Sequence, residues 1–125
     1  MSMTQKPKVE LEEFAKAINA FELALNAEKT DLHRDATIQR FEFCVELAWK
    51  CSKKILGLSS NAPKTIVREL AQEGIITSAL AWIEFVDLRN MTSHTYKQEL
   101  AEEVYKKCRP FLKEAQSLLQ KLQSY

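Results

Sequence analysis

Eight consecutive residues in the C-terminal half of the chain carry side chains that can handle a phosphate group. The stretch 89–96 reads RNMTSHTY and combines a guanidinium, an amide, hydroxyls, an imidazole and a phenol. Arg89 offers a planar fork of donors that matches phosphate oxygens, and His94 carries an imidazole, a group that can take or give a proton in catalysis. An arginine and a histidine without metal ligands suit RNA cleavage by the 2′-hydroxyl. His94 would move the proton and Arg89 would stabilise charge on the phosphorus oxygens.

The remaining polar residues of this stretch allow a functional or a structural interpretation. Asn90, Thr92 and Ser93 can hold a water molecule or a sugar hydroxyl. The Tyr96 phenol can donate a hydrogen bond, stack on a base or be modified. The structural alternative is that these residue types close a helix, where they satisfy unpaired backbone groups and suit the negative end of the helix dipole. On spacing alone, this structural alternative is the favoured one.

The five-residue separation of Arg89 and His94 sets a geometric condition on any shared site. Each residue of an α-helix turns by about 100°, so the two side chains lie about 140° apart on a continuous helix. They converge if the chain breaks near Thr92 or Ser93, or if a second copy of the protein brings the two groups together.

Length and composition indicate one globular domain. The chain has 125 residues, of which 46% are hydrophobic and 28% are charged, as in a folded chain with a single core. The net charge of +1 drives the chain neither onto nucleic acid nor onto an anionic membrane. Any RNA-binding charge must come from local clusters, for which the candidates are Arg34, Arg40, Lys50, Lys97, Lys106, Lys107 and Arg109. The alternative is that these cations lie on solvated helix faces.

The expected location is the cytoplasm, away from the membrane. No uninterrupted apolar run approaches the about 20 residues of a membrane span, and the N-terminal MSMTQKPKVELEEF lacks the apolar core of a signal peptide. The chain has an odd number of cysteines at wide spacing, Cys44, Cys51 and Cys108. This pattern predicts reduced thiols that fill the core. We expect no metal site and no cofactor, because no second Cys or His pair completes a ligand set.

Helical periodicity dominates the chain. Two glycines and three prolines leave few turns for a β-protein. Apolar stripes at helical spacing and their flanking caps predict helices over about 9–27, 32–56, 63–73, 78–92 and 97–123. We therefore expect an all-α fold, an antiparallel four-helix up-and-down bundle with a short additional helix. Residues 1–125 form one domain in this interpretation, with residues 1–8 flexible.

Five aromatic residues on the second and fourth predicted helices have two possible roles. Aromatic rings can stack on bases, but at helical spacing they more often fill a core or a dimer interface. We expect the second role for Phe41, Phe43, Trp49, Trp82 and Phe85.

The order of several sequence blocks carries a resemblance that spacing alone does not. Arg-x4-His-x-Tyr at 89–96 resembles the signature of the HEPN superfamily of helical-bundle proteins. RDATIQRFEFCVELAWK at 34–50 and APKTIVRELAQEGII at 62–76 resemble successive blocks of the family called nucleotidyltransferase substrate-binding proteins. AWIEFVDLRNMTSHTY at 81–96, followed by AEEVY, continues the match over roughly residues 9–123.

The resemblance implies a four-helix bundle that forms a homodimer, with the two motif regions near each other across the interface. It also implies a partner, a small and separately encoded nucleotidyltransferase of the minimal type. In one view of the family, the subunit presents substrate to that enzyme. In a newer view, such pairs are toxin–antitoxin modules, in which the HEPN protein is a metal-independent endoribonuclease. The nucleotidyltransferase silences that ribonuclease by adding AMP to the motif tyrosine.

On this sequence the implied roles fall on Arg89 and His94 for cleavage and on Tyr96 for modification. Asn90 follows the motif arginine as in the family and supports it, and Ser93 is the second supporting residue. RNA or a nucleotide would be a further partner. The leading hypothesis is the nucleotidyltransferase partner subunit, because it rests on the whole-chain resemblance. The ribonuclease is the alternative, and a third hypothesis is an interaction bundle in which the motif only caps a helix.

Overall fold

Residues 8–125, which the computed structural model describes, contain only helices and the segments that connect them. The expected all-α class is therefore confirmed. Of the expected flexible segment, residues 1–7 lie outside the described part, and residue 8 is helical instead. The elements in chain order are α1 (Lys8–Asn26), α2 (Asp31–Leu56), α3 (Pro63–Gln72), α4 (Ala79–Asn90), the 3-10 helix η1 (Thr92–His94) and α5 (Gln98–Ser124).

The helix boundaries follow local capping chemistry. The Thr30 hydroxyl accepts a hydrogen bond from the backbone N–H of His33 at 3.1 Å and caps α2. Ser78 does the same for α4 through the N–H of Ala81. Gly57 ends α2 in the left-handed region, with φ of 67°, where a glycine avoids the steric cost of a side chain. These caps lie within two residues of the helix ends that the sequence predicted at 32, 56 and 78.

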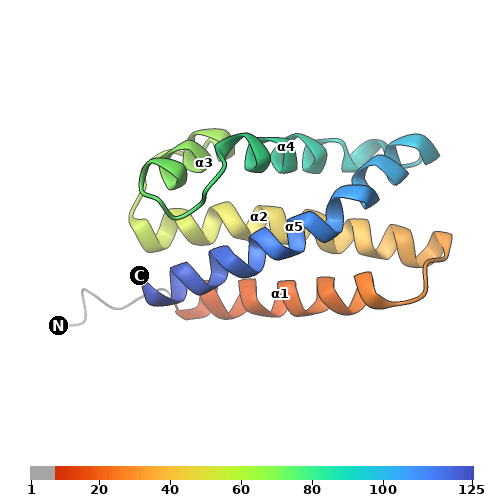
Figure 1. Ribbon diagram of the computed structural model, residues 1–125, viewed down its shortest axis with the longest axis horizontal. Coiled ribbons are helices and arrows are strands. Elements are labelled where there is room, and N and C mark those ends of the chain that lie inside the picture. The colour runs from red at the N-terminus through yellow and green to blue at the C-terminus, as the bar shows by residue number, and fades with distance from the viewer. Residues whose placement is uncertain (1–7) are drawn as a thin grey trace.

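Successive long helices alternate in direction along the bundle, as Figure 1 shows. α1 packs along α2, and α5 packs against both of them. The shorter α3 and α4 pack on each other and also against α2, and α4 contacts α5. The α1–α2 turn and η1 therefore lie at one end of the bundle, and the start of α1 and the C-terminus lie at the other (Figure 1).

Phe111 is the centre of an aromatic core that joins four helices. Its ring centroid on α5 lies 5.1 Å from Phe41 on α2 and 5.0 Å from Phe85 on α4. Trp82 of α4 lies at 5.5 Å and Phe21 of α1 at 5.9 Å. The neighbouring Pro110 lies inside α5 without ending the helix. Three of the predicted core aromatics are thus buried together.

The other two predicted aromatics lie nearer the surface, and the cysteines lie inside. Phe43 is 44% exposed and Trp49 is half-buried. All three cysteines are buried and unbridged, as expected of core thiols. Burial raises the pKa of Cys44 and of Cys108 to about 12, and that of Cys51 to about 11, so these thiols stay protonated and unreactive at neutral pH.

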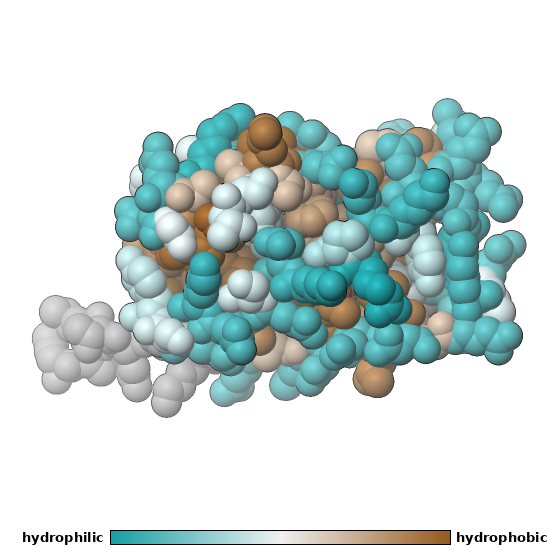
Figure 2. All heavy atoms as spheres, viewed as in Figure 1, coloured by the Kyte–Doolittle hydropathy of each residue, from teal (hydrophilic) through white to brown (hydrophobic). Residues whose placement is uncertain are grey.

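The surface carries scattered apolar residues on a mainly hydrophilic background. Figure 2 shows hydrophilic residues covering much of the end that carries η1, and isolated apolar spots elsewhere on this face. The most exposed aliphatic residues are Leu80, Leu32 and Leu23. None of the helices in residues 8–125 combines the length and the apolar character that crossing a membrane requires.

The first prediction concerns the aromatic core. Phe111→Ala removes the ring that α1, α2 and α4 all contact, and the cavity left behind should lower the free energy of unfolding by about 3–5 kcal/mol. Urea denaturation followed by circular dichroism measures this loss. Lys113→Ala, on the exposed face of the same helix, should change stability by no more than about 0.5 kcal/mol. Equal effects of the two substitutions would contradict a central role for Phe111.

Candidate functional site

The chain turns sharply inside the RNMTSHTY stretch, two residues earlier than the sequence suggested. α4 was expected to reach residue 92, but it ends at Asn90 and continues as the 3-10 turn η1. The Thr92 hydroxyl donates to the carbonyl oxygen of Arg89 at 2.7 Å, and the Thr95 hydroxyl donates to that of Thr92 at 2.9 Å. Such local side-chain bonds compete with helix continuation. They stabilise the turn over residues 91–96, which is called the corner.

Arg89 turns towards α2 and meets two carboxylates there. Its Nη2 lies 3.4 Å from Oε2 of Glu42, and its Nε lies 2.8 Å from Oε1 of Glu46. The second contact is an ion pair without a hydrogen bond, because the Nε–H does not point at the oxygen. The side chain is 28% exposed, so one edge of the guanidinium stays open to solvent while its charge is shared with two acids.

Glu42 and Glu46 are site residues that the sequence analysis missed. They lie four residues apart on α2, hence on one helical face, and Lys50 continues the row with its Nζ 3.4 Å from Oε2 of Glu46. The spacing of these three residues was the available signal. It did not identify Arg89 as their partner, because the sequence does not give the relative height of α2 and α4.

His94 and Tyr96 lie together on the exposed side of the corner. Their ring centroids are 6.3 Å apart at an interplanar angle of 66°, and Tyr96 is 78% exposed. Within the described residues neither a hydrogen bond nor an ion pair joins Arg89 to His94. Asn90 and Ser93 are also exposed, and their supporting roles stay predictions. The corner thus brings His94 and Tyr96 together, whereas Arg89 of α4 is held by carboxylates of α2.

A buried cation fixes the helices that flank the corner. Arg34 of α2 is 6% exposed and donates to Glu102 of α5 at 3.0 Å and to Asp35 at 3.2 Å. Lys29 of the α1–α2 turn reaches the same Glu102 at 2.7 Å. The bond to Glu102 is the main cause that raises the pKa of Arg34. The bonds from Lys29 and then Arg34 lower the pKa of Glu102.

Arg34 is therefore unsuited to the role of RNA contact for which the sequence analysis considered it, because its guanidinium is buried among carboxylates. Other candidates are also engaged. Lys50 pairs with Glu46, and Lys107 pairs with a glutamate of α4 at 3.2 Å. Within residues 8–125, the exposed candidates with neither an ion pair nor a side-chain hydrogen bond are Arg40, Lys97 and Lys106. Among these candidates, free positive charge is thus limited to three side chains, of which Lys97 directly follows Tyr96.

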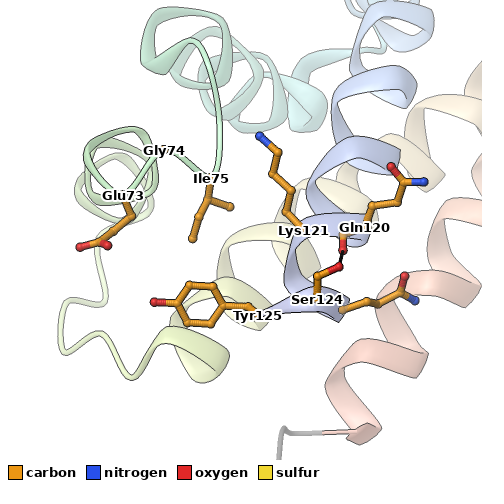
Figure 3. Close-up of a pocket in the computed structure, with 8 residues that line it drawn as sticks. Glu73, Gly74, Ile75, Gln120, Lys121, Ser124 and Tyr125 are labelled. Atoms are coloured by element: carbon orange, nitrogen blue, oxygen red, sulfur yellow. Dashed lines mark hydrogen bonds between the residues drawn. The ribbon is translucent and has the colours of Figure 1, made fainter.

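Two of the surface depressions on the described residues lie at opposite ends of the bundle. A groove of about 440 Å³, here the α2–η1 groove, lies beside the corner and is lined by Leu32, Asp35, Ala36, Ile38, Gln39, Glu42, Thr92 and Thr95. A second groove of about 620 Å³ lies between the α3–α4 connection and the last turn of α5. Figure 3 shows Tyr125, Lys121 and Glu73 around it. It lies at the other end of the bundle from RNMTSHTY (Figure 1), so the α2–η1 groove is the one relevant to the site.

Comparison with known proteins gives consistent matches. Residues 9–124 match the sequence profile of a family described as nucleotidyltransferase substrate binding protein like. Over 93 residues, the chain is 39% identical to a Haemophilus influenzae protein named probable ribonuclease HepT. That match covers 68% of this chain and 64% of the relative, so the chain spans less than two thirds of the relative's length.

Two solved structures share the fold. A protein from Thermus thermophilus is 28% identical, with a TM-score of 0.82 over 87% of this chain and 98% of that one. A protein from Haemophilus influenzae, described as having the fold of a substrate binding domain of a nucleotidyltransferase, is 30% identical. Its TM-score is 0.78 over 90% of this chain and 98% of that one.

The second prediction tests the ion pairs that flank the corner. Because the pKa of Glu102 is lower in the folded state, its charge stabilises the fold at pH values above its unfolded pKa, which is about 4.3. This contribution is lost as the pH falls through the lower folded pKa. Glu102→Gln should therefore unfold more easily than wild type at pH 7, and the difference should shrink below about pH 4. Thermal unfolding of both proteins across this range measures it, and a difference that does not depend on pH would contradict the ion-pair explanation.

Proposed function

The chain belongs to the family described as nucleotidyltransferase substrate binding protein like, and on this premise we propose that it is the partner subunit of a separately encoded minimal nucleotidyltransferase. It presents Tyr96 to that enzyme, and the pair works in the cytoplasm as a toxin–antitoxin module. The observation that carries the proposal is the Tyr96 phenol, 78% exposed on a corner pinned by two threonine hydroxyls.

The chemistry of the proposed modification fits this placement. The Tyr96 phenol oxygen attacks the α-phosphorus of ATP, a bond to the adenylyl group forms, and pyrophosphate leaves. The phenol proton passes to a base of the transferase or to water. An acceptor hydroxyl must enter the active site of another protein, so an exposed ring on a fixed corner loses little conformational entropy on binding. Phosphoryl transfer is catalysed mainly by positioning the reactants and neutralising charge. The nucleotidyltransferase would supply the metal ions that neutralise the phosphates of ATP, and this chain would supply the positioned phenol.

We also propose that the working form is a homodimer. Phe43 of α2 is 44% exposed and Leu80 of α4 is 82% exposed, and these apolar side chains can be covered by a second copy. Within one chain, the Arg89 guanidinium is held by α2 carboxylates while His94 lies on the corner. In a dimer, the Arg89 of one copy can lie beside the His94 of the other.

The alternative function is a metal-independent endoribonuclease that the same modification silences. It is favoured by the 39% identity to a protein named probable ribonuclease HepT and by the exposed imidazole of His94. His94 would take the proton of an RNA 2′-hydroxyl, whose oxygen attacks the adjacent phosphorus. The bond to the 5′-oxygen breaks and that oxygen takes a proton from water, which leaves a 2′,3′-cyclic phosphate and a 5′-hydroxyl. Arg89 would stabilise the phosphorus oxygens with the edge that Glu42 and Glu46 leave open.

The third prediction tests the presentation of Tyr96. Incubation with the minimal nucleotidyltransferase, ATP and Mg²⁺ should raise the intact mass of the wild-type chain by one adenylyl group. Tyr96→Phe should stay unmodified, because it lacks the acceptor oxygen. Tyr125→Phe is the matched control, since that tyrosine is 60% exposed at the other end of the bundle, and it should be modified like wild type. Unchanged modification of Tyr96→Phe would overturn the assignment of the acceptor.

The fourth prediction tests the alternative. Purified, unmodified protein should cleave RNA in EDTA, and His94→Gln should lower the rate by about 10²- to 10⁴-fold through loss of proton transfer. His33→Gln replaces the other histidine, which is exposed at the start of α2, and should cleave at the wild-type rate. Absence of cleavage by the unmodified wild-type protein would remove the ribonuclease alternative and leave the partner-subunit proposal standing.

A further inference from the structure

The α2–η1 groove is lined by both apolar and acidic residues, and the two acids are called its acidic rim. Leu32, Ala36 and Ile38 line it from α2, and Asp35 and Glu42 of the same helix also line it. Thr92 and Thr95 close its other side, and both hydroxyls donate to backbone carbonyls. The groove is therefore a depression whose lining combines apolar side chains with two carboxylates.

This lining fits a long cationic side chain. The methylene stem of a lysine or arginine packs on apolar walls while its charged head reaches a carboxylate. A cavity volume of about 440 Å³ lies within the about 300–1,000 Å³ range of ligand sites, so the groove can take such a side chain together with its neighbours. An RNA phosphate is disfavoured here, because Asp35 and Glu42 would repel it.

None of the described residues that line the groove is a cation. Of the nearby cations, Arg34 is buried against Glu102 and Asp35, and Lys29 is paired with Glu102. Arg89 contacts Glu42 from the α4 side. The rim acids are thus only partly neutralised, and Asp35 keeps 61% of its side chain exposed.

We propose that the α2–η1 groove is the docking site for a basic side chain of the partner nucleotidyltransferase. This inference rests on the proposed function and adds the surface by which the partner is held. Tyr96 directly follows the groove residue Thr95, so docking in the groove places the partner beside the hydroxyl that it modifies. Complementary charges at such a rim speed association and select the partner.

Docking in the groove also affects Arg89. Glu42 lines the groove and is at the same time the carboxylate 3.4 Å from Nη2 of Arg89. A cation that enters the groove competes for this carboxylate, and Glu46 then remains the main partner of Arg89. Occupancy of the groove is in this way transmitted to the guanidinium of the candidate site.

The experiment places a positive charge in the groove and leaves every residue of the two ion-pair networks unsubstituted. Gln39→Lys and Ala36→Arg change exposed groove residues, and Gln116→Lys is the matched control on the exposed face of α5. The probe is the separately encoded minimal nucleotidyltransferase of the proposed pair, and its Kd is measured by calorimetry at two salt concentrations. Light scattering establishes the oligomeric state of every variant.

We expect wild type and Gln116→Lys to bind alike and both groove variants to bind about tenfold or more weakly. Gln39→Glu should bind at least as tightly as wild type. Undiminished binding by both groove variants would overturn the docking site and leave the proposed function intact. No binding by wild type would overturn both. If the groove variants changed the oligomeric state and left the Kd unchanged, the occupant would be a second copy, and the inference would be wrong.

Discussion

The packing of Phe111 against three other helices is the constraint on which the candidate site depends. Phe41 of α2 and Phe85 of α4 contact this one ring at nearly equal distances, so their heights along the bundle are tied to each other. Glu42 follows Phe41 directly, and Arg89 lies one helical turn beyond Phe85. The aromatic core therefore brings the guanidinium to the α2 carboxylates. The packing of Phe111 thus determines which residues can form the Arg89–Glu42 ion pair, because a packed interior permits little sliding of one helix past another.

Electrostatic pairing decides what the motif end of the bundle offers to other molecules. Arg34 and Arg89 are both held by carboxylates of this chain. Affinity for RNA comes largely from free cations that neutralise phosphates, and few such cations lie here. An exposed phenol, an exposed imidazole and a groove with an acidic rim remain. This combination suits binding to a basic protein surface better than high-affinity binding to RNA. It therefore favours the partner-subunit function over the ribonuclease.

The sequence by itself determined the helices and the identity of the chemical groups. The caps at Thr30, Gly57 and Ser78 could be read because each depends on contacts within a few residues. The core roles of Phe41, Trp82 and Phe85 followed from helical periodicity. Residue order alone also identified RNMTSHTY and the family to which the chain belongs.

The tertiary structure decided which of these groups meet. The pairing of Arg89 with Glu42 and Glu46, the burial of Arg34 and the α2–η1 groove each join residues far apart in the chain. Local pattern carries no information on the relative height of two helices, and a shift of one turn would put a different side chain opposite each arginine. The early end of α4 is a local effect instead, because the Thr92 hydroxyl bonds to the backbone three residues earlier and competes with helix continuation. Only the packed core fixes these registers, since only there do distant residues touch.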